Sequence, residues 1–437
     1  MSREFDIVIS TIILVICLCT FISCDTTRPD VYEVKNDGDI VMTTQGKVID
    51  IWLISEGDVK VDWGDGTVES FNYNEEEQDL LKVKHYYEEV ISHTINIYGK
   101  ITQFRNHYGR INNLNVTNCS TLQYLDCSSN RISKLDISSN SMLEVLICNY
   151  NNLTALDCTN NPLLSVIGCS NNQIVSLNVS ANPLLRNLIC SFNKLTSLEL
   201  SNNPLLSFLY CSNNNIASLE LDNSPLLREL DCSKNELACL RISNNHDLRN
   251  LYCRDNYLDN LILSGAEGLY DLRCDNNKLT NIDLSQNLLL TRITASNNNL
   301  TQINVSNNND LNLIDLSNNQ LLNIDISKNV NLRDLDIGFN QITTLNIMNN
   351  TYLVYLNIRN NNIIQLDASN SIFLGFIECS YNILTTTELN NLFQSLSKRD
   401  SLGLVFIGFN IGSDNCDMSI AENKGWNVIN YVYGGAK

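Results

Sequence analysis

The chain has 437 residues, and its 48 acidic and 29 basic side chains give a net charge of −19. This balance makes nucleic acid and anionic membrane surfaces poor partners, because no basic patch offsets the repulsion. The four histidines have no recognisable spacing to a nucleophile, and there is no phosphate-cradling glycine loop, metal motif or nucleophile elbow. We therefore expect no enzyme, and no catalytic, cofactor-binding or metal residues.

The first apolar stretch, residues 7–19, is short for a membrane span and suits a signal peptide. It is followed by Thr20-Phe21-Ile22-Ser23-Cys24, which resembles a bacterial lipobox although Phe21 and Ile22 depart from the usual residues. The resemblance implies a lipoprotein signal peptide over residues 1–24 and lipidation of Cys24, which would anchor the chain to a membrane. An ordinary secretory signal or an uncleaved anchor is the alternative.

Residues 25–100 form the next predicted unit. Runs at 48–54 and 93–98 alternate as strands do, and Asp65-Gly66 marks a hairpin turn, because glycine accepts a positive φ. The string Trp63-Gly-Asp-Gly-Thr67, followed by His85-Tyr86-Tyr87, resembles polycystic-kidney-disease (PKD-like) domains, which implies a small immunoglobulin-type β-sandwich. We expect a spacer or cap. Asp62 and Asp65 could be imagined as calcium ligands, but two carboxylates on one turn are too few for a site.

From residue 122 the chain repeats every 21 residues. A leucine opens each copy and an asparagine follows eight residues later, and both are present in all thirteen copies: Leu122, Leu143, Leu164, Leu185, Leu206, Leu227, Leu248, Leu269, Leu290, Leu311, Leu332, Leu353 and Leu374, followed by Asn130, Asn151, Asn172, Asn193, Asn214, Asn235, Asn256, Asn277, Asn298, Asn319, Asn340, Asn361 and Asn382. A fixed period of this length predicts a solenoid over residues 122–384.

Each copy predicts one strand in its L-x-x-L-x-C segment, and stacked strands would form a parallel concave sheet. A second alternating run, such as residues 135–138, predicts a short extended segment on the convex side. The invariant asparagine should bond backbone groups of its own and adjacent turns. A serine such as Ser138, with the asparagine two residues on, should cap the second bend.

Both ends of the solenoid need caps. Residues 101–121 follow the repeat register with Gly109 at the asparagine position, which predicts an N-terminal capping repeat. Residues 385–437 predict a helix-containing repeat and cap: a threonine-capped helix from about Thr386, a strand over 402–410 and a last helical turn over 418–424.

Nine of the sixteen cysteines share one repeat position: Cys127, Cys148, Cys169, Cys190, Cys211, Cys232, Cys253, Cys274 and Cys379. Aliphatic residues fill this position elsewhere, which indicates a small apolar slot. Adjacent strands lie about 4.8 Å apart, which is too far for unstrained disulfides, so we expect a reduced, buried ladder. The sequence does not indicate a pairing for Cys119, Cys158, Cys239 or Cys416.

The repeats resemble the leucine-rich repeats of bacterial surface proteins, and their length and strand cysteine make them closest to the internalin J-like type and related lipoproteins. The resemblance covers roughly residues 101–437. It implies a mainly β fold, a curved leucine-rich repeat solenoid after the PKD-like sandwich. It also implies a non-enzymatic role in adhesion or host-protein binding, at the bacterial cell surface or outer membrane.

Variable strand positions should face out of the concave side. In the first seven copies these positions give one apolar and aromatic strip: Tyr124, Val145, Ile147, Val166, Ile189, Phe208, Tyr210 and Tyr252. Exposed surface of this kind usually marks an interaction site, although β-strands favour such residues in any case. The sequence predicts an adhesin-like protein that binds a macromolecule, most simply a protein. A glycan-binding lipoprotein and a structural envelope protein are the alternatives.

Overall fold

The computed structural model describes residues 38–72 and 80–430. The predicted signal peptide and Cys24 lie outside the described residues. The fold is mainly β and begins with antiparallel strands, which are β1 (Ile40–Thr44), β2 (Val48–Ser55), β3 (Val59–Asp62), β4 (Val68–Phe71), β5 (Leu81–Tyr86), β6 (His93–Tyr98), β7 (Ile101–Arg105) and β8 (Ile111–Asn115).

These eight strands belong to two sheets. One has the order β4-β3-β6-β1-β8, and in the other β2 pairs with both β5 and β7. Burial alternates along β2, where Ile49, Ile51 and Leu53 are buried, and along β6, where Ile95 and Ile97 are. The period of two therefore sends one face of each of these strands into the core.

The hairpin between β3 and β4 forms where Asp65-Gly66 predicts it. Gly64 and Gly66 have φ values of 73° and 94°. A Cβ on Gly64 would lie 2.2 Å from the carbonyl oxygen of Thr94, so only glycine fits there. The turn brings Asp62 opposite Val68.

The second of these sheets continues into the solenoid. Gln103 of β7 pairs in parallel with Tyr124 of β9 (Tyr124–Asp126), the first strand of the repeats. The expected capping repeat thus belongs both to the solenoid and to the antiparallel sheets, because its strand β7 also pairs with β2 and its strand β8 pairs with β1. One set of backbone hydrogen bonds joins the antiparallel strands to the repeats.

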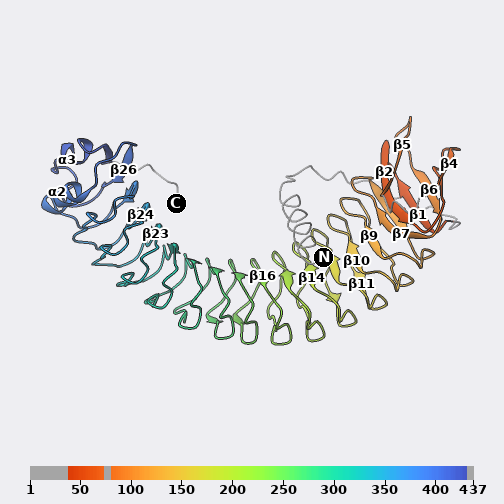
Figure 1. Cartoon of the computed structure of the whole chain (residues 1–437), viewed down its shortest axis with the longest axis horizontal. Helices are drawn as coiled ribbons and strands as arrows, with labels where there is room; N and C mark the ends of the chain where they lie inside the picture. Colours follow the sequence, from red (N-terminus) through yellow and green to blue (C-terminus); the bar gives the residue numbers. More distant parts are fainter. Residues whose placement is uncertain (1–37, 73–79, 431–437) are drawn as a thin grey trace. The chain divides into compact units, whose positions relative to one another are not determined.

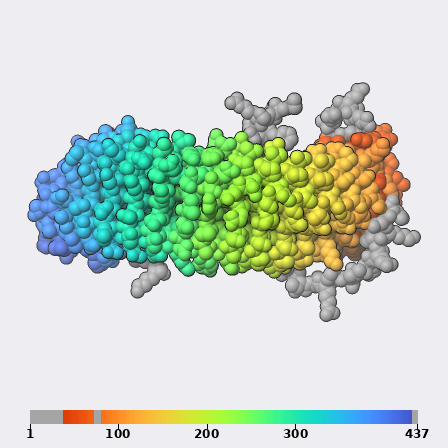
Figure 2. All heavy atoms as spheres, turned by 90° about the horizontal axis from the view of Figure 1, so that it is seen from below, coloured from red at the N-terminus to blue at the C-terminus, as the bar shows by residue number. Residues whose placement is uncertain are grey.

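Every later repeat adds one short strand in register (Figure 1). Leu146 pairs with Leu125 on one side and Ile167 on the other, so each step along the sheet is one 21-residue repeat. The strands are β10 (Val145–Ile147), β12 (Val166–Gly168), β14 (Asn187–Ile189), β15 (Phe208–Tyr210), β16 (Glu229–Asp231), β18 (Asn250–Tyr252), β20 (Asp271–Arg273), β21 (Arg292–Thr294), β22 (Leu313–Asp315), β23 (Asp334–Asp336), β24 (Tyr355–Asn357) and β25 (Phe376–Glu378). Figure 2, turned by 90° so that the molecule is seen from below, shows the repeats as adjacent bands in sequence order.

The convex side differs from the expectation. Strands form there only as two pairs, β11 (Leu156–Asp157) with β13 (Leu177–Asn178), and β17 (Cys239–Arg241) with β19 (Asn260–Ile262). The apolar residues of the second run are buried in the other repeats as well, for example Leu135 and Ile137, but the backbone there is irregular. Alternation reports which face is buried, and it does not require hydrogen bonding between neighbours.

The invariant asparagine bonds the backbone as predicted. Asn214 donates from Nδ2 to the carbonyls of Cys190 and Cys211, at 3.1 and 3.0 Å, and accepts from the Leu195 amide at 3.0 Å. One side chain therefore joins two consecutive turns, and the same pattern recurs from Asn130 to Asn382.

A second asparagine row stabilises the other bend. Asn203 is buried and donates to the carbonyls of Val179 and Asn182, each at 3.0 Å. The serine expected to cap this bend donates its own backbone amide to the side chain two residues earlier. Asp283, for example, accepts the amide of Ser285 at 2.9 Å.

The residue before each invariant asparagine of the repeats has a left-handed backbone conformation. Its φ lies between 53° and 58° from Ser129 to Tyr381, although none of these residues is glycine. The left-handed conformation turns the chain sharply after the concave strand.

The C-terminal end contains α2 (Thr386–Ser395), β26 (Gly403–Phe406), α3 (Ser419–Glu422) and β27 (Trp426–Ile429). Thr385, one residue earlier than expected, caps α2 by accepting the amide of Glu388. β26 extends the parallel sheet beside β25. Asn410 continues the row of invariant asparagines, because it donates to the carbonyls of Cys379 and Ile407. Among the described residues, no helix is both long and apolar enough to cross a membrane.

Candidate binding surface

The open face of the parallel sheet is built from two residues of each three-residue strand. The middle residue, such as Leu209 of β15, is fully buried, whereas Phe208 and Tyr210 on either side are half-buried. Because the strands pair in register, these outer positions form two straight rows along the sheet.

All eight strip residues lie on these rows and are half-buried: Tyr124, Val145, Ile147, Val166, Ile189, Phe208, Tyr210 and Tyr252. They do not form one strip. Tyr124, Val145 and Val166 are consecutive neighbours, but the buried Asn187 separates Val166 from Phe208.

The second row is interrupted as well. Ile189 pairs with Tyr210, but Asp231 lies between Tyr210 and Tyr252. The Arg273 guanidinium lies 4.9 Å from the centre of the Tyr252 ring. Tyr252 therefore belongs to a charged part of the face. The other seven residues form what we call the apolar patch, which Asn187 and Gly168 interrupt and which ends at Tyr210: Tyr124, Val145, Ile147, Val166, Ile189, Phe208 and Tyr210.

Burial, with Glu229 nearby, raises the pKa of Tyr210 well above that of a free tyrosine. Its hydroxyl therefore stays protonated at physiological pH, and it is engaged by a hydrogen bond with Glu229.

The open face also extends beyond the repeats, which the spacer or cap interpretation missed. On β2, Trp52 faces away from the buried Ile51 and Leu53, and the Lys82 ammonium lies 5.0 Å from its ring. On β7, the Arg105 guanidinium lies 4.2 Å from the Tyr124 ring. The alternation of residues 48–54 already separated Trp52 from the core residues, and only the pairing of β7 with β9 was unforeseen.

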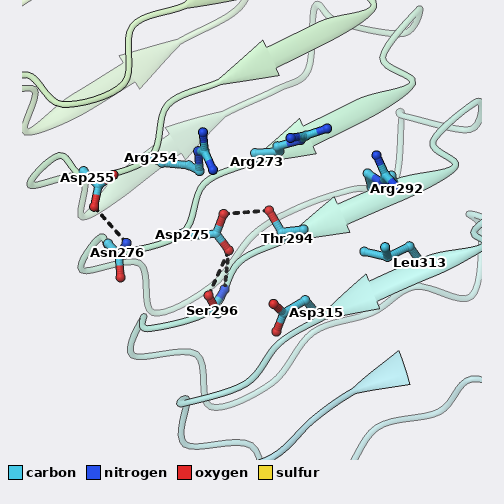
Figure 3. Close-up of a pocket in the computed structure, with 10 residues that line it drawn as sticks. All are labelled: Arg254, Asp255, Arg273, Asp275, Asn276, Arg292, Thr294, Ser296, Leu313 and Asp315. Atoms are coloured by element: carbon cyan, nitrogen blue, oxygen red, sulfur yellow. Dashed lines mark hydrogen bonds between the residues drawn. The ribbon is translucent and has the colours of Figure 1, made fainter. Parts of the chain in front are cut away.

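A hollow of about 490 Å³ opens on the face between β18 and β22 (Figure 3). Its arginines are Arg254, Arg273 and Arg292. Its carboxylates are Asp255, Asp275 and Asp315. Asp255 accepts from Asn276 at 2.8 Å, Asp275 accepts from Thr294 and Ser296, and Asp315 accepts from Ser317.

A second hollow of about 340 Å³ adjoins the first and shares Thr294, Leu313 and Asp315 with it. Here the charged residues are Asp315, Asp334 and Asp336, and Tyr355 lines one side. The Tyr355 ring stacks on Phe376 with centroids 4.8 Å apart, and Phe376 contacts Phe406. The strip prediction left out these aromatic residues because they lie in later repeats.

The ladder cysteines form no chemical site in the structure. They are buried and free, and burial raises the pKa of each ladder thiol, to values at which the thiolate does not form near neutral pH. Of the remaining cysteines in the described residues, Cys119 and Cys158 are buried, Cys239 is exposed and Cys416 is partly buried. None of these four is paired, and no cluster of metal-binding side chains occurs within residues 38–72 and 80–430.

Comparison with known proteins assigns the family. No protein-family model and no curated protein matches the chain. Among solved structures, the functional domain of InlJ from Listeria monocytogenes, described as including a cysteine ladder, is 30% identical, covers 76% of this chain and 75% of that chain, and has a TM-score of 0.67. The chain belongs to the internalin-like leucine-rich repeat proteins.

Two further structures share the fold. A leucine-rich repeat protein of Leptospira interrogans is 21% identical over 64% of this chain and 78% of that one, with a TM-score of 0.59. The internalin InlF of Listeria monocytogenes is 20% identical over 76% and 87%, with a TM-score of 0.53. At these identities the likeness concerns the fold alone.

The internalin-like solenoid carries one more exposed apolar feature, on its flank. The residue before the leading leucine is exposed in several neighbouring repeats, including Met142, Leu163, Leu184 and Leu226. Recurrence at the repeat period could have revealed this flank row from the sequence.

The carboxylates of Asp62 and Asp65, considered above as calcium ligands, bind groups of the protein itself. Asp62 accepts the amide of Gly64, and Asp65 accepts the amide of Thr67 and lies 2.7 Å from the Nε2 atom of His85. Both carboxylates thus fix the hairpin.

Proposed function

We propose that this internalin-like chain is a non-enzymatic binding protein that recognises a protein partner through the open face of its parallel sheet. The apolar patch from Tyr124 to Tyr210 carries the proposal. Aromatic side chains on a rigid sheet lose little conformational freedom on binding, and they dominate the energetics of protein interfaces.

The proposal includes anchorage at the cell envelope. It rests on the lipobox-like sequence ending at Cys24, whose acylation would tether the chain without a spanning helix. We also propose that residues 25–100 are a PKD-like β-sandwich, supported by the Trp63-Gly-Asp-Gly-Thr67 string and the antiparallel pairing around it. Because β2 and β7 extend the open face, this part contributes to binding as well as spacing.

The test is a capture experiment with residues 25–437 immobilised and extracellular host proteins in solution. The informative variant is Phe208→Ala with Tyr210→Ala, which shortens the apolar patch. Its matched control is Tyr257→Ala with Tyr270→Ala, two exposed aromatic residues at other repeat positions. Circular dichroism establishes that both variants fold.

A protein captured by the wild type and by the control, and weakened at least about tenfold by the patch variant, supports the proposal. Equal capture by both variants contradicts it. Binding of glycans alone on an array would favour the glycan-binding alternative, because stacked aromatic residues also suit sugar rings.

A further inference from the structure

Beyond the apolar patch, two adjoining hollows on the open face differ in charge: the first mixes arginines with aspartates, and the charged residues of the second are aspartates alone. The hollow bounded by Arg254, Arg273 and Arg292 directly adjoins the hollow bounded by Asp315, Asp334 and Asp336. Figure 3 shows the three arginines at one end and Asp315 at the other, with Thr294 and Leu313 between them.

The first hollow is lined by three arginines and three carboxylates, and two of its arginines keep unused donors. Arg273 is bound by Asp271 through two hydrogen bonds of 3.2 and 2.9 Å, and the same carboxylate lies 3.8 Å from Arg292. Nε of Arg292 is buried and has no hydrogen-bond partner within the described part of the chain. Arg254 is exposed, and it makes no ion pair with any described residue. Arg254 and Arg292 therefore keep donors for an outside carboxylate.

The second hollow offers acceptors without a cation. Asp336 accepts only from the Gly338 amide and Asn357, and Asp315 only from Ser317. No described lysine or arginine makes an ion pair with Asp315, Asp334 or Asp336. Burial raises the pKa of Asp315 and of Asp336, with other nearby carboxylates adding to the shift. A bound cation would stabilise the ionised form of both carboxyls, which burial and the neighbouring carboxylates disfavour.

The spacing of the two hollows defines what fits. Neighbouring strands lie about 4.8 Å apart, so β21, which carries Arg292, and β23, which carries Asp334 and Asp336, are separated by roughly 10 Å. An extended chain covers that distance in about three to four residues.

We propose that the open face between β18 and β24 binds an extended peptide segment of the protein partner. The segment places an acidic residue on Arg292, and a basic residue three to four positions away on Asp334 and Asp336; Arg254, two repeats before Arg292, offers a donor to a further acidic residue. This inference rests on the proposed protein-binding function and names the chemistry of the segment. The Tyr355 ring beside the aspartates adds a face on which a cation can lie.

The test uses two fluorescent decapeptides of identical composition and no net charge. Each has one glutamate, one lysine and eight glycines; the two charged residues are four positions apart in one peptide (the spaced peptide) and next to each other in the other (the adjacent peptide). A neutral probe is needed because a protein of net charge −19 attracts any polycation. Binding is followed by fluorescence anisotropy at low salt.

The informative variant is Asp334→Asn with Asp336→Asn. Its matched control is Asp325→Asn with Asp367→Asn, which removes the same charge from exposed positions off the open face. Asp325 and Asp367 accept the amide two residues on, as Asp336 does. The Phe208→Ala and Tyr210→Ala variant is measured alongside.

We expect the spaced peptide to bind about fivefold more tightly than the adjacent one. The Asp334→Asn and Asp336→Asn variant, called the concave variant, should lose that preference while the control keeps it. The patch variant should bind the peptide normally, so failure of the apolar patch as a protein site leaves this result intact. Equal binding of the two peptides, or equal losses in the concave variant and its control, would overturn the inference.

Discussion

Asn214 illustrates how a single side chain holds one turn of the solenoid to the next. It satisfies an amide and a carbonyl of the preceding turn and a carbonyl of its own, all of them buried. Backbone groups at a buried bend have no water to bond, so the amide side chain is required at every copy.

Replacing Asn214 with alanine should lower the free energy of unfolding by roughly 3 kcal/mol, because buried backbone groups lose their partners. Asn223, an exposed residue of the same repeat, is the control, and Asn223→Ala should change stability by less than about 0.5 kcal/mol. Urea unfolding measures both. Similar small effects from the two variants would mean that the ladder does not hold the turns.

Lys234 tests the left-handed turn, since its φ is 55°. Glycine adopts this conformation without strain, so Lys234→Gly should stabilise the fold by about 0.5–1 kcal/mol, whereas Lys234→Val should destabilise it. The midpoint of thermal unfolding reports the sign. The opposite order of the two variants would show that this position is not held left-handed in solution.

The cysteine ladder makes a prediction about reactivity. Burial raises the pKa of Cys158 to about 12 and that of the ladder thiols as well, so these groups should resist alkylation at pH 8. Exposed Cys239 should be labelled in the native protein. Peptide mass spectrometry after iodoacetamide treatment compares native and urea-treated samples. Ladder labelling as fast as that of Cys239 would contradict a buried, closed core.

At the scale of elements, the antiparallel strands and the repeats are joined by one sheet, through the pairing of β7 with β9. The hairpin between β3 and β4 is then fixed by its own side chains. Trp63 stacks on His85 at 4.5 Å, and Tyr87 donates a hydrogen bond to the carbonyl of Trp63. Asp65 links the turn to this aromatic group through His85.

Asp65 therefore gives the hairpin a pH dependence. Burial raises the pKa of the Asp65 carboxyl, but hydrogen bonds from His85 and Thr67 lower it by more than burial raises it. The resulting pKa is about 2. A carboxyl whose folded pKa lies below its unfolded value stabilises the protein above about pH 4 and loses that contribution as the pH falls towards 2.

The variant Asp65→Asn should be less stable than the wild type at pH 5, and the difference should shrink by pH 2.5. Calorimetric midpoints at the two values measure it, with the exposed Asp58→Asn as a charge-matched control. A difference that stays constant with pH would exclude the proposed contribution of Asp65.

Sequence patterns were sufficient to predict the repeat strands, the row of invariant asparagines and the C-terminal helix, because each of these follows from local burial and hydrogen bonding. They failed for the convex side, since the alternation at residues such as Leu135 and Ile137 reports burial and not strand pairing. They also failed where partners lie far apart in the chain. The pairing of Gln103 with Tyr124 has no local signal, so Trp52 could not be placed on the same open face.

At the scale of the whole molecule, the described sheet presents different chemistry along its length. An apolar patch ends at Tyr210, arginines and aspartates follow from β18 to β23, and stacked aromatic residues lie from β24 to β26. A net charge of −19 keeps nonspecific anionic partners away from this surface. The central claim is that partners bind on this side of the solenoid.

Site-specific photo-crosslinking tests that claim most directly. A photoreactive amino acid is placed at Phe208 on the open face in one protein, and at the exposed Glu220 in the second run of the same repeat in another. The account predicts that a captured partner cross-links from position 208 and not from position 220. Cross-linking from position 220 alone, or equally from both, would contradict it.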